Sequence, residues 1–394
     1  MQIQTGMSTE STAQQAIEDI MSQLQQEPSC QPDFVALHFS VGWEPTEVQA
    51  AATAAFRTRA LHGGSSCQGV MTDKGLAMRD GRGMGAFAIW DKDGAYGSAM
   101  VDLTSDPRIA ARQATEAALR QADREGEAPD LVWLTTAPGA EEAVLEGIKD
   151  VLGREAIIVG GSSADNDVSG KWAQFTNEGT AANSVVVSVL FPSSPISCAY
   201  QSGYAPTGQS GQVTRVEGRR LYEIDAKPAA AVYSAWTDAV VREAGTEDVS
   251  ILAESTFFPL GRPSQTLGGV TFHLLAHPAF AHPDGSLSLF ADVSPGETLC
   301  LMGGSADSLV ARARRVAASS REGLAGACVG GALIIYCGGC MLAVQERMEE
   351  VALGVSQALG DAPFLGVFTF GEQGAPLGSE TSHGNLMISC SSFG

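Results

Sequence analysis

The sequence predicts a mixed α/β fold, in which β-sheets covered by helices form two pseudo-related domains. Apolar runs of strand length alternate with amphipathic helical segments along most of the chain. A Gly-Gly-Ser-Ser phrase occurs twice, beginning at Gly63 and at Gly160, so the two copies lie 97 residues apart. The second half of the chain also repeats the order of elements found in residues 84–166. These observations indicate duplicated units, with an internal repeat at residues 33–70 and 130–168.

Each copy of the repeat is expected to run strand, helix, strand and glycine loop. In the first copy we expect strands at 34–39 and 59–65, separated by a helix at 45–59. The second copy has the corresponding elements at 130–135, 141–152 and 156–160, and its helix has apolar residues at helical spacing. A surface helix at 12–24 precedes both copies.

A β-hairpin is expected between the two copies, because Asp93-Gly94 separates apolar runs at 84–90 and 96–103. The second half offers a hairpin at 287–290 and 298–302, followed by a helix, a strand, a helix and a strand that ends at Phe370. This order predicts a distant third copy of the unit. The composition changes after Val213, so we place the domain boundary near residue 220, giving domains 1–220 and 221–394. The strands are almost continuously apolar, as in sheets covered on both faces, and a four-layer sandwich is one such arrangement.

Composition narrows the classes of function. The chain has 394 residues and a formal net charge of −21, which disfavours binding to nucleic acid and to anionic lipid surfaces. The longest apolar run, 329–344, is interrupted by glycines, and the first residues lack the features of a secretory signal. Eight cysteines are dispersed through a chain large enough to have a substantial core, so we expect them to be reduced. We therefore expect a cytoplasmic protein without membrane insertion and without nucleic acid as a partner.

The two glycine loops are the first candidate site. Paired glycines permit positive φ and close approach to the backbone, while the following hydroxyl and N–H groups supply donors. Two such loops at equivalent strand ends are expected to form two walls of one pocket, although both also fit the simpler interpretation of tight turns. Carboxylates in such turns suit an ammonium or amide group of a ligand. The expected ligand-binding residues are Gly63, Gly64, Ser65, Ser66, Cys67, Gly161, Ser162, Asp165, Asn166, Cys337, Glu372, His383 and Asn385.

The pair Cys337 and Cys340 gives a second candidate. A C-x-x-C pair between a strand and a helix is either a redox dithiol or two small buried thiols at a tight turn. The sequence lacks the tryptophan before the pair and the proline after it that thioredoxin-like sites have. No second cysteine pair at zinc spacing is present, and no metal site is expected.

Histidines give a third candidate, because one neutral imidazole suffices as an axial ligand to heme. His62 stands beside the first glycine loop and His383 near the end of the chain, so these two are the axial candidates; a hydrogen-bonded core histidine is the alternative for each. Hydrolase and nucleotide motifs are absent, since the sequence contains neither a G-x-S-x-G elbow nor a phosphate-binding P-loop. No catalytic residue is therefore assigned.

In their order and spacing these pieces resemble the FIST family of bacterial sensory proteins, whose two domains also occur in an animal F-box ubiquitin-ligase subunit. The match rests on MQIQTGMSTES at the start, the Gly63–Ser66 loop, VGGSSADND from Val159 and SGYAPTGQSGQVTRVEGRRLYEIDAKPAAAVY from Ser202. It continues with Phe258-Pro259-Leu260-Gly261, GALIIYCGGCMLAV from Gly331, FLGVFTFGEQG from Phe364 and His383-Gly384-Asn385. The chain departs from the family pattern at Cys340, where relatives often have Arg, and at Gln373, where they have Ile.

The resemblance implies a FIST N-terminal-like domain followed by a FIST C-terminal-like domain. It also implies a non-catalytic sensor for a small ligand, such as an amino acid or similar metabolite, that signals through a separate partner. Some relatives look like heme-containing nitric-oxide sensors that regulate histidine kinases, which makes heme the alternative cofactor. A thiol or redox enzyme using Cys337 and Cys340 is the third hypothesis.

Overall fold

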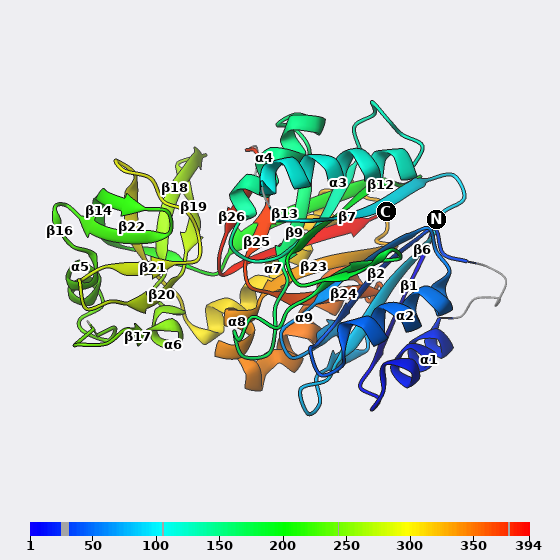
Figure 1. The fold of residues 1–394 in the computed structure, drawn as a ribbon, viewed down its shortest axis with the longest axis horizontal. Helices are drawn as coiled ribbons and strands as arrows, with labels where there is room; N and C mark the ends of the chain where they lie inside the picture. The colour runs from blue at the N-terminus through cyan, green and yellow to red at the C-terminus, as the bar shows by residue number, and fades with distance from the viewer. Residues whose placement is uncertain (25–30, 105, 243, 377–378) are drawn as a thin grey trace.

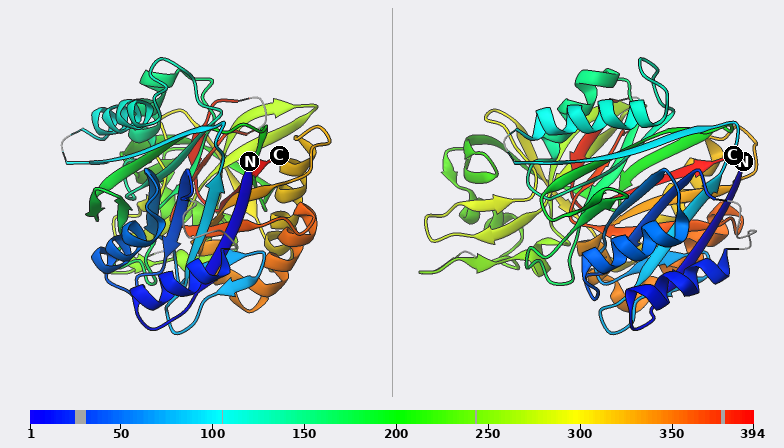
Figure 2. Two further views of the ribbon diagram at one scale, coloured as in Figure 1. Left: turned by 90° about the vertical axis from the view of Figure 1, so that its right-hand side faces the viewer. Right: turned by 45° about the vertical axis from the view of Figure 1, so that its right-hand side comes forward.

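The computed structural model describes residues 1–24, 31–104, 106–242, 244–376 and 379–394. It has two parts, a body that contains both chain termini and a lobe formed by residues 205–303 (Figure 1). Both termini lie at the end of the body farthest from the lobe, as the two further views also show (Figure 2). The mixed α/β class predicted from the sequence is confirmed.

Three six-stranded sheets with one common strand order form the body. The first sheet has the order β1 (Gln2–Ser8), β6 (Met84–Trp90), β2 (Phe34–Phe39), β3 (Ala60–Ser65), β10 (Gln174–Thr176) and β11 (Gly179–Ala181). The second has the order β7 (Ala95–Asp102), β12 (Ser184–Phe191), β8 (Leu131–Thr136), β9 (Ile158–Ser162), β25 (Glu372–Gly374) and β26 (Ser382–Gly384). The third has the order β13 (Ile196–Ser202), β27 (Met387–Phe393), β23 (Gly331–Cys337), β24 (Phe364–Thr369), β4 (Val70–Thr72) and β5 (Gly75–Ala77).

In each sheet the third and fourth strands are parallel and their other neighbours are antiparallel. The chain therefore contains three units of one design: unit 1 (residues 2–90), unit 2 (95–191) and unit 3 (196–204 with 304–393). The third copy predicted from the order of elements is present. Its first strand is β13, however, and not the expected hairpin at 287–302, whose strands pair with other strands of the lobe.

The last two strands of each sheet come from a different unit. Unit 1 contributes β4 and β5 to the sheet of unit 3, unit 2 contributes β10 and β11 to that of unit 1, and unit 3 contributes β25 and β26 to that of unit 2. This cyclic exchange fixes the three units against one another through backbone hydrogen bonds. It also brings the ends of β3, β9 and β24 to one place in the body.

Each sheet has a pair of helices on its outer face, and all three sheets share an inner core. The pairs are α1 (Ala13–Gln23) with α2 (Pro45–Phe56), α3 (Pro107–Gln121) with α4 (Glu141–Leu152), and α7 (Ala306–Glu322) with α9 (Met348–Leu359). Buried side chains from every sheet meet in the inner core, for example Phe34, Trp133 and Leu333. Strands such as β2 and β8 are buried along their whole length because both faces are covered, which is why they read as continuous apolar runs.

Local sequence sets the helix boundaries. Asp106 accepts hydrogen bonds from the N–H groups of Arg108 and Ile109 at the start of α3, and Pro107 occupies the first turn, where no N–H partner is needed. Ser305 and Ser308 form a reciprocal capping box at the start of α7.

The predicted hairpin at 84–103 is wrong, although both of its strands exist. β6 pairs with β1 and β2 in the first sheet, whereas β7 pairs with β12 in the second. The Asp-Gly segment is thus a corner between two sheets. Asp91 stabilises this corner, because its carboxylate accepts hydrogen bonds from Tyr96 Oη and from the N–H and Oγ of Ser193.

The lobe is a nine-stranded sheet with its own core, inserted between β13 and α7 of unit 3. Its strand order is β17 (Val249–Ser250), β20 (Pro278–Ala281), β21 (Leu287–Leu289), β15 (Arg220–Ile224), β14 (Ala205–Glu217), β22 (Thr298–Gly303), β18 (Leu260–Leu267) and β19 (Val270–Ala276), with β16 (Lys227–Pro228) beside β15. Helices α5 (Ala229–Trp236) and α6 (Leu252–Ser255) accompany this sheet. The domain boundary expected near residue 220 stays a prediction.

Candidate functional site

The strand ends that carry the Gly-Gly-Ser-Ser phrases lie together, but they pack directly on one another. The N–H of Ala164 donates to the Ser65 carbonyl at 3.0 Å, and the N–H of Phe370 donates to the Ser162 carbonyl at 3.0 Å. The N–H of Cys67 donates to the Phe368 carbonyl at 2.9 Å, so all three units take part in this contact. The donors and acceptors expected to face a ligand are therefore used between the units.

The glycines of these phrases lie inside β3 and β9 and have no positive φ. Glycine occupies these positions because there is no room for a side chain. A Cβ on Gly63 would lie 2.1 Å from the Phe175 ring, and one on Gly161 would lie 2.4 Å from the Thr369 side chain. The expected glycine turns are thus strand segments into which neighbouring side chains fit closely.

Three of the four serine hydroxyls in the two phrases also have partners inside the protein, while Ser163 Oγ is buried without one among the described residues. Ser65 Oγ accepts from the Ala173 N–H at 2.9 Å, and Ser66 Oγ accepts from the Phe368 N–H at 2.9 Å. Ser162 Oγ donates to Glu141 Oε1 at 2.7 Å. Cys67 is fully buried, and burial, with Asp165 nearby, raises the pKa of its thiol to about 12. The ends of β3 and β9 are sealed.

Asp165 and Asn166 fix the loop that follows β9. The Asp165 carboxylate accepts hydrogen bonds from the N–H groups of Val168 and Lys171, among others. Asn166 Oδ1 accepts from the Gln68 N–H at 2.8 Å, and its Nδ2 donates to the Gly81 carbonyl at 3.1 Å. Asp165 thus holds its own loop of unit 2 in place, and Asn166 joins this loop to unit 1.

The ends of β23 and β24 in unit 3 differ from those of β3 and β9. A cavity of about 470 Å³ lies there, between the body and the lobe. Thr369 and Phe370 line it from the end of β24, while Cys337 and Gly339 line it from the end of β23 and from α8 (Gly338–Ala343). The lobe contributes residues from α6 and from the loops after β19 and β21. The full lining is Pro138, Val168, Trp172, Leu252, Ala253, Thr256, Phe257, His277, Phe290, Cys337, Gly339, Leu342, Ala343, Thr369, Phe370 and Asn385.

Most of this lining is apolar and aromatic. Trp172 and Phe370 meet edge to face with ring centroids 6.5 Å apart, and His277 lies 5.9 Å from Phe290. Lining of this kind, with a few convergent polar groups, is typical of small-molecule sites.

Asn385 supplies the distinctive polar atom of the cavity. Its Oδ1 accepts a hydrogen bond from the His277 N–H at 3.0 Å, which fixes the orientation of the amide. Its Nδ2 is buried and has no hydrogen-bond partner among the described residues. An unpaired buried amide donor is costly in free energy, so this group is suited to donating to a ligand.

The other polar groups of the lining are uncharged at neutral pH. Burial lowers the pKa of His277 to about 4. Burial, reinforced by the neighbouring Cys340, raises the pKa of the Cys337 thiol well above its ordinary value. Because the thiolate is the reactive form of cysteine, these surroundings give no support to the hypothesis of a thiol enzyme.

Glu372 lies directly behind the cavity wall. Its carboxylate accepts hydrogen bonds from Thr369 Oγ1 and from the Met387 N–H, each at 2.9 Å. The side chain is fully buried, and burial together with the nearby Cys337 raises the pKa of this carboxyl group well above its usual value. Glu372 thus supports Thr369 and is not exposed to the cavity.

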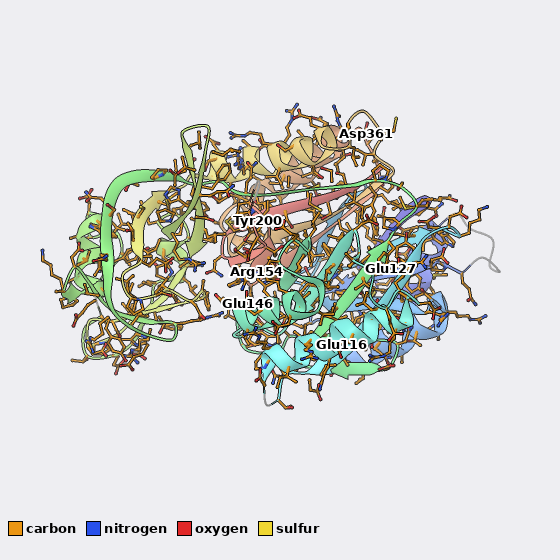
Figure 3. The ribbon with its side chains drawn as sticks, turned by 90° about the horizontal axis from the view of Figure 1, so that it is seen from above. Glu116, Glu127, Glu146, Arg154, Tyr200 and Asp361 are labelled. Atoms are coloured by element: carbon orange, nitrogen blue, oxygen red, sulfur yellow. The ribbon has the colours of Figure 1, made fainter. Side chains whose placement is uncertain are left out.

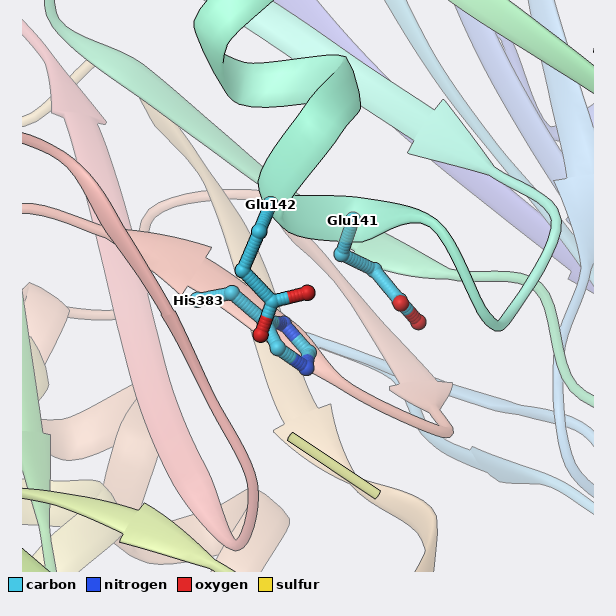
Figure 4. Close-up of side chains that lie close together, drawn as sticks. All are labelled: Glu141, Glu142 and His383. Carbon is cyan, nitrogen blue, oxygen red and sulfur yellow. The ribbon is translucent and has the colours of Figure 1, made fainter. Parts of the chain in front are cut away.

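His383 belongs to a separate cluster with Glu141 and Glu142 (Figure 4). The ligand atoms of these three residues lie within 4.8 Å of one another, but Arg219 already supplies the positive charge. Its Nη2 lies 2.7 Å from Glu141 Oε2 and 2.6 Å from Glu142 Oε2. Burial opposes ionisation of Glu142, but His383 and Arg219 outweigh it and hold the pKa of Glu142 at about 2. The cluster is an ion-pair network that joins α4 to the lobe.

Neither expected axial histidine fits a heme. His62 is fully buried, with Nδ1 2.8 Å from Ser188 Oγ and Nε2 2.7 Å from Thr135 Oγ1. The two ring nitrogens of His383 lie near Gln373 Nε2 and the Phe290 carbonyl. Axial ligation needs a ring nitrogen that is free to face the iron. Both histidines instead have the hydrogen-bonded core role that was their alternative interpretation.

Of the residues expected from the sequence to bind a ligand, Cys337 and Asn385 line the cavity. Most of the others lie behind the cavity or in the sealed strand ends: Gly63, Gly64, Ser65, Ser66, Cys67, Gly161, Ser162 and Glu372. The remaining three take part in local hydrogen-bond networks: Asp165, Asn166 and His383. Sequence reasoning missed the lobe residues Thr256, Phe257, His277 and Phe290. The phrase that begins at Phe258 was noted in the sequence, but nothing in it indicated that this region would meet Cys337.

Comparisons with known proteins identify the family. Residues 33–227 match the FIST N domain and residues 229–375 match the FIST C domain. The chain belongs to the FIST family. FIST domains are sensory domains that bind small ligands in signal transduction.

Other similarities are weaker. An uncharacterized protein of Methanocaldococcus jannaschii is 37% identical over 84 residues, which are 21% of this chain and 16% of that protein. The match thus spans only a small part of that relative. A crystal structure of cyanuric acid hydrolase from A. caulinodans aligns with a TM-score of 0.36 at 10% identity, over 99% of this chain and 98% of that chain. No helix in the described parts of the chain is long and apolar enough to span a membrane.

Proposed function

We propose that this FIST protein is a non-catalytic sensor for an uncharged, largely apolar small molecule that binds in the cavity between body and lobe. The observation that carries the proposal is the unpaired Nδ2 of Asn385 in a wall that is mostly apolar and carries no charged side chain. A ligand with a carbonyl or similar acceptor at one end would satisfy this donor, while its remainder packs against Trp172, Phe257, Phe290 and Phe370. The volume of about 470 Å³ lies within the usual range for small-molecule sites.

Charge decides the class of ligand. The described lining contains no Asp, Glu, Lys or Arg, and His277 and Cys337 are neutral at pH 7. Burying an unpaired ammonium or carboxylate here would carry a large desolvation cost. A free amino acid as the ligand stays a prediction, and the lining favours an uncharged molecule over it.

Signalling follows if the ligand stabilises one arrangement of lobe and body. The cavity has walls from both parts, so a bound molecule contacts the lobe through α6 and the body through α8 and Asn385. Moving a two-state equilibrium from mostly one state to mostly the other requires about 5.5 kcal/mol of differential binding free energy. We propose that the output passes to a separate cytoplasmic partner, with a histidine kinase as one such partner.

A binding screen on two isosteric variants tests the proposal. Benzamide and related neutral amides are compared with phenylalanine by calorimetry and thermal unfolding of the full chain. Asn385→Asp keeps the acceptor for the His277 N–H but loses the Nδ2 donor, so the affinity for neutral amides should fall roughly tenfold to a hundredfold. Asn183→Asp, at an exposed asparagine that does not line the cavity, is the matched control and should bind as the wild type does.

Two results would overturn the proposal. One is a panel in which phenylalanine binds and all neutral amides do not. The other is unchanged affinity in Asn385→Asp.

A further inference from the structure

A second cavity, of about 260 Å³, lies elsewhere along the junction of body and lobe. The body lines it with residues of β13, α7 and β27, and the lobe lines it with the starts of β14 and β19 and with Met302. Tyr200 on β13 marks its position in the body, close to the lobe (Figure 3). The full lining is Tyr200, Gln201, Ser202, Tyr204, Ala205, Pro206, Val270, Thr271, Phe272, His273, Met302, Arg312, Pro376 and Met387.

Arg312 is the one charged residue of this lining. Its Nε is buried and has no hydrogen-bond partner, and no carboxylate of the described residues forms an ion pair with its guanidinium. Burial, followed by the like charge of Arg315, lowers the pKa of Arg312. A half-buried cation without a counterion is unusual in a chain with a net charge of −21, because partners of opposite sign are abundant.

The remaining polar groups of the cavity do not supply the missing negative charge. Tyr200 Oη donates to the Glu372 carbonyl and Tyr204 Oη donates to the Thr256 carbonyl, so both phenols already have partners. Gln201, Ser202, Thr271 and His273 complete the polar side of the lining with uncharged groups. Apolar side chains form the rest, including Met302, Met387 and Phe272.

From these observations we infer that the second cavity binds a small organic carboxylate, whose charged end pairs with Arg312 and whose apolar end packs against Met302, Met387 and Phe272. The planar guanidinium matches a carboxylate with two parallel hydrogen bonds. One unpaired cation balances one negative charge, which favours a monocarboxylate over a dianionic phosphate. This inference does not depend on the ligand proposed for the first cavity.

The position of the site indicates what binding would do. Arg312 lies on α7 of the body, while Phe272 and His273 lie on β19 of the lobe. Beside Arg312, the chain passes from body to lobe at Gly203, whose backbone packs against Leu309 of the same helix. A carboxylate held between them would join the two parts at the point where the chain crosses.

The inference is tested by comparing how butyrate, butyramide and inorganic phosphate bind to the full chain. Thermal unfolding and calorimetry at constant ionic strength measure the binding. Butyrate at about ten times its Kd should raise the Tm by roughly 2 °C, and butyramide and phosphate should not. Arg312→Gln should abolish the effect of butyrate. Arg314→Gln removes the same charge from an exposed position on α7 and should leave the effect intact.

The unliganded variant provides an independent readout. If the guanidinium lacks a partner, Arg312→Gln should unfold at the same temperature as the wild type or at a higher one. The inference is overturned if butyrate and butyramide act alike, if phosphate binds in preference to butyrate, or if Arg312→Gln retains the effect. A Tm lowered by several degrees in the unliganded variant would also overturn it, because the guanidinium would then be a paired structural group. Asn385 does not line this cavity, so failure here is distinguishable from failure of the sensor proposal.

Discussion

The end of β9 in unit 2 and the end of β24 in unit 3 occupy equivalent places in sheets of the same strand order, yet one is sealed and the other opens to a cavity. Ser162 ends β9 with its hydroxyl bonded to Glu141 and its carbonyl accepting from Phe370. Thr369 ends β24, and it lines the cavity together with Cys337 from the neighbouring strand. The topology is shared, so the fold by itself does not make a binding site.

Two insertions in unit 3 account for the difference. The short helix α8 follows β23, where units 1 and 2 lack a corresponding helix in the described chain, and the lobe is inserted between β13 and α7. These segments supply the walls opposite Thr369 and Cys337. The three units thus share the same strand ends, and the segments found in unit 3 alone leave one of these ends open.

Glycine substitutions give the largest expected contrast between sealed and open ends. A Cβ on Gly160 would lie 2.0 Å from the Leu134 carbonyl oxygen, so Gly160→Ala should lower the free energy of unfolding by about 4 kcal/mol or more. A Cβ on Gly339, at the open end, would be 3.4 Å from Leu386, and Gly339→Ala should change stability by less than about 1 kcal/mol. Urea unfolding measures both. Equal losses in the two variants would show that the third end is packed as tightly as the second.

Removing the ion pairs between α4 and the lobe should have the next largest effect. Arg219→Gln leaves Glu141, which is 1% exposed, without its ion-pair partner, and should cost about 3 kcal/mol. Arg215→Gln is the matched control, because Arg215 pairs with Glu223 at an exposed position of the same sheet. Chemical denaturation of both variants checks this. A loss in Arg219→Gln no greater than in Arg215→Gln would mean that the lobe is held by other contacts.

Acid should destabilise both kinds of strand end through their buried histidines. His38 lies near the sealed end of β3 and His277 at the open cavity, and burial lowers the pKa of each to about 4. As pH falls from about 6.5 toward 4 the unfolded chain takes up protons that the folded chain excludes, so each histidine removes up to about 3 kcal/mol of stability.

Glu372 acts in the opposite direction. Its raised pKa gives stability that is present below the ordinary pKa of a glutamate and is lost as the pH rises. Because Glu372 is present in both proteins, the difference in pH dependence between the wild type and His277→Gln gives the contribution of His277 to the unfolding free energy. Unfolding free energies at pH 7.5 and pH 5 should differ less in His277→Gln than in the wild type. Identical pH dependence in the two proteins would show that His277 is not held neutral.

The smallest expected effect concerns the rim of the hairpin that unit 3 contributes to unit 2. Arg154 pairs with Glu146 at 3.3 Å and with Glu380, in the turn of that hairpin, at 2.8 Å, and the side chain of Arg154 is 61% exposed. Figure 3 labels Arg154 and Glu146. Exposed ion pairs contribute little, so Arg154→Ala should cost at most about 1 kcal/mol. Thermal unfolding measures the change. A cost of several kcal/mol would mean that charge, and not backbone pairing, holds the exchanged hairpin.

Much of the unit could be predicted from the sequence, because local patterns determine it. Apolar runs marked β2, β8, β23 and β24, helical periodicity marked the helices between them, and the offset between Gly63 and Gly160 revealed the repeat. What could not be predicted was pairing between distant segments. The Asp93-Gly94 signal is local, and it indicates a turn without specifying that the next strand joins another sheet.

The candidate site shows the same limit. Cys337 and Asn385 were expected to bind a ligand, and both line the cavity, but their role there stays a prediction. The Gly-Gly-Ser-Ser phrases were conspicuous because close packing between strands demands glycine, for which the sequence gives the same signal as for a ligand-binding turn. The residues from the lobe, such as His277 and Phe290, carry no motif, and only the fold brings them to the cavity.

A crystal structure with the tightest-binding neutral amide tests the central claim most directly, since that claim is that the open end of unit 3 holds the ligand. The account predicts electron density for the amide between Phe257, Phe290 and Phe370, with its carbonyl oxygen within hydrogen-bond distance of Asn385 Nδ2. It also predicts that the strand ends at Ser65 and Ser162 stay closed. Density for the amide at those closed ends, or an empty cavity in a crystal where the amide binds elsewhere, would contradict the account.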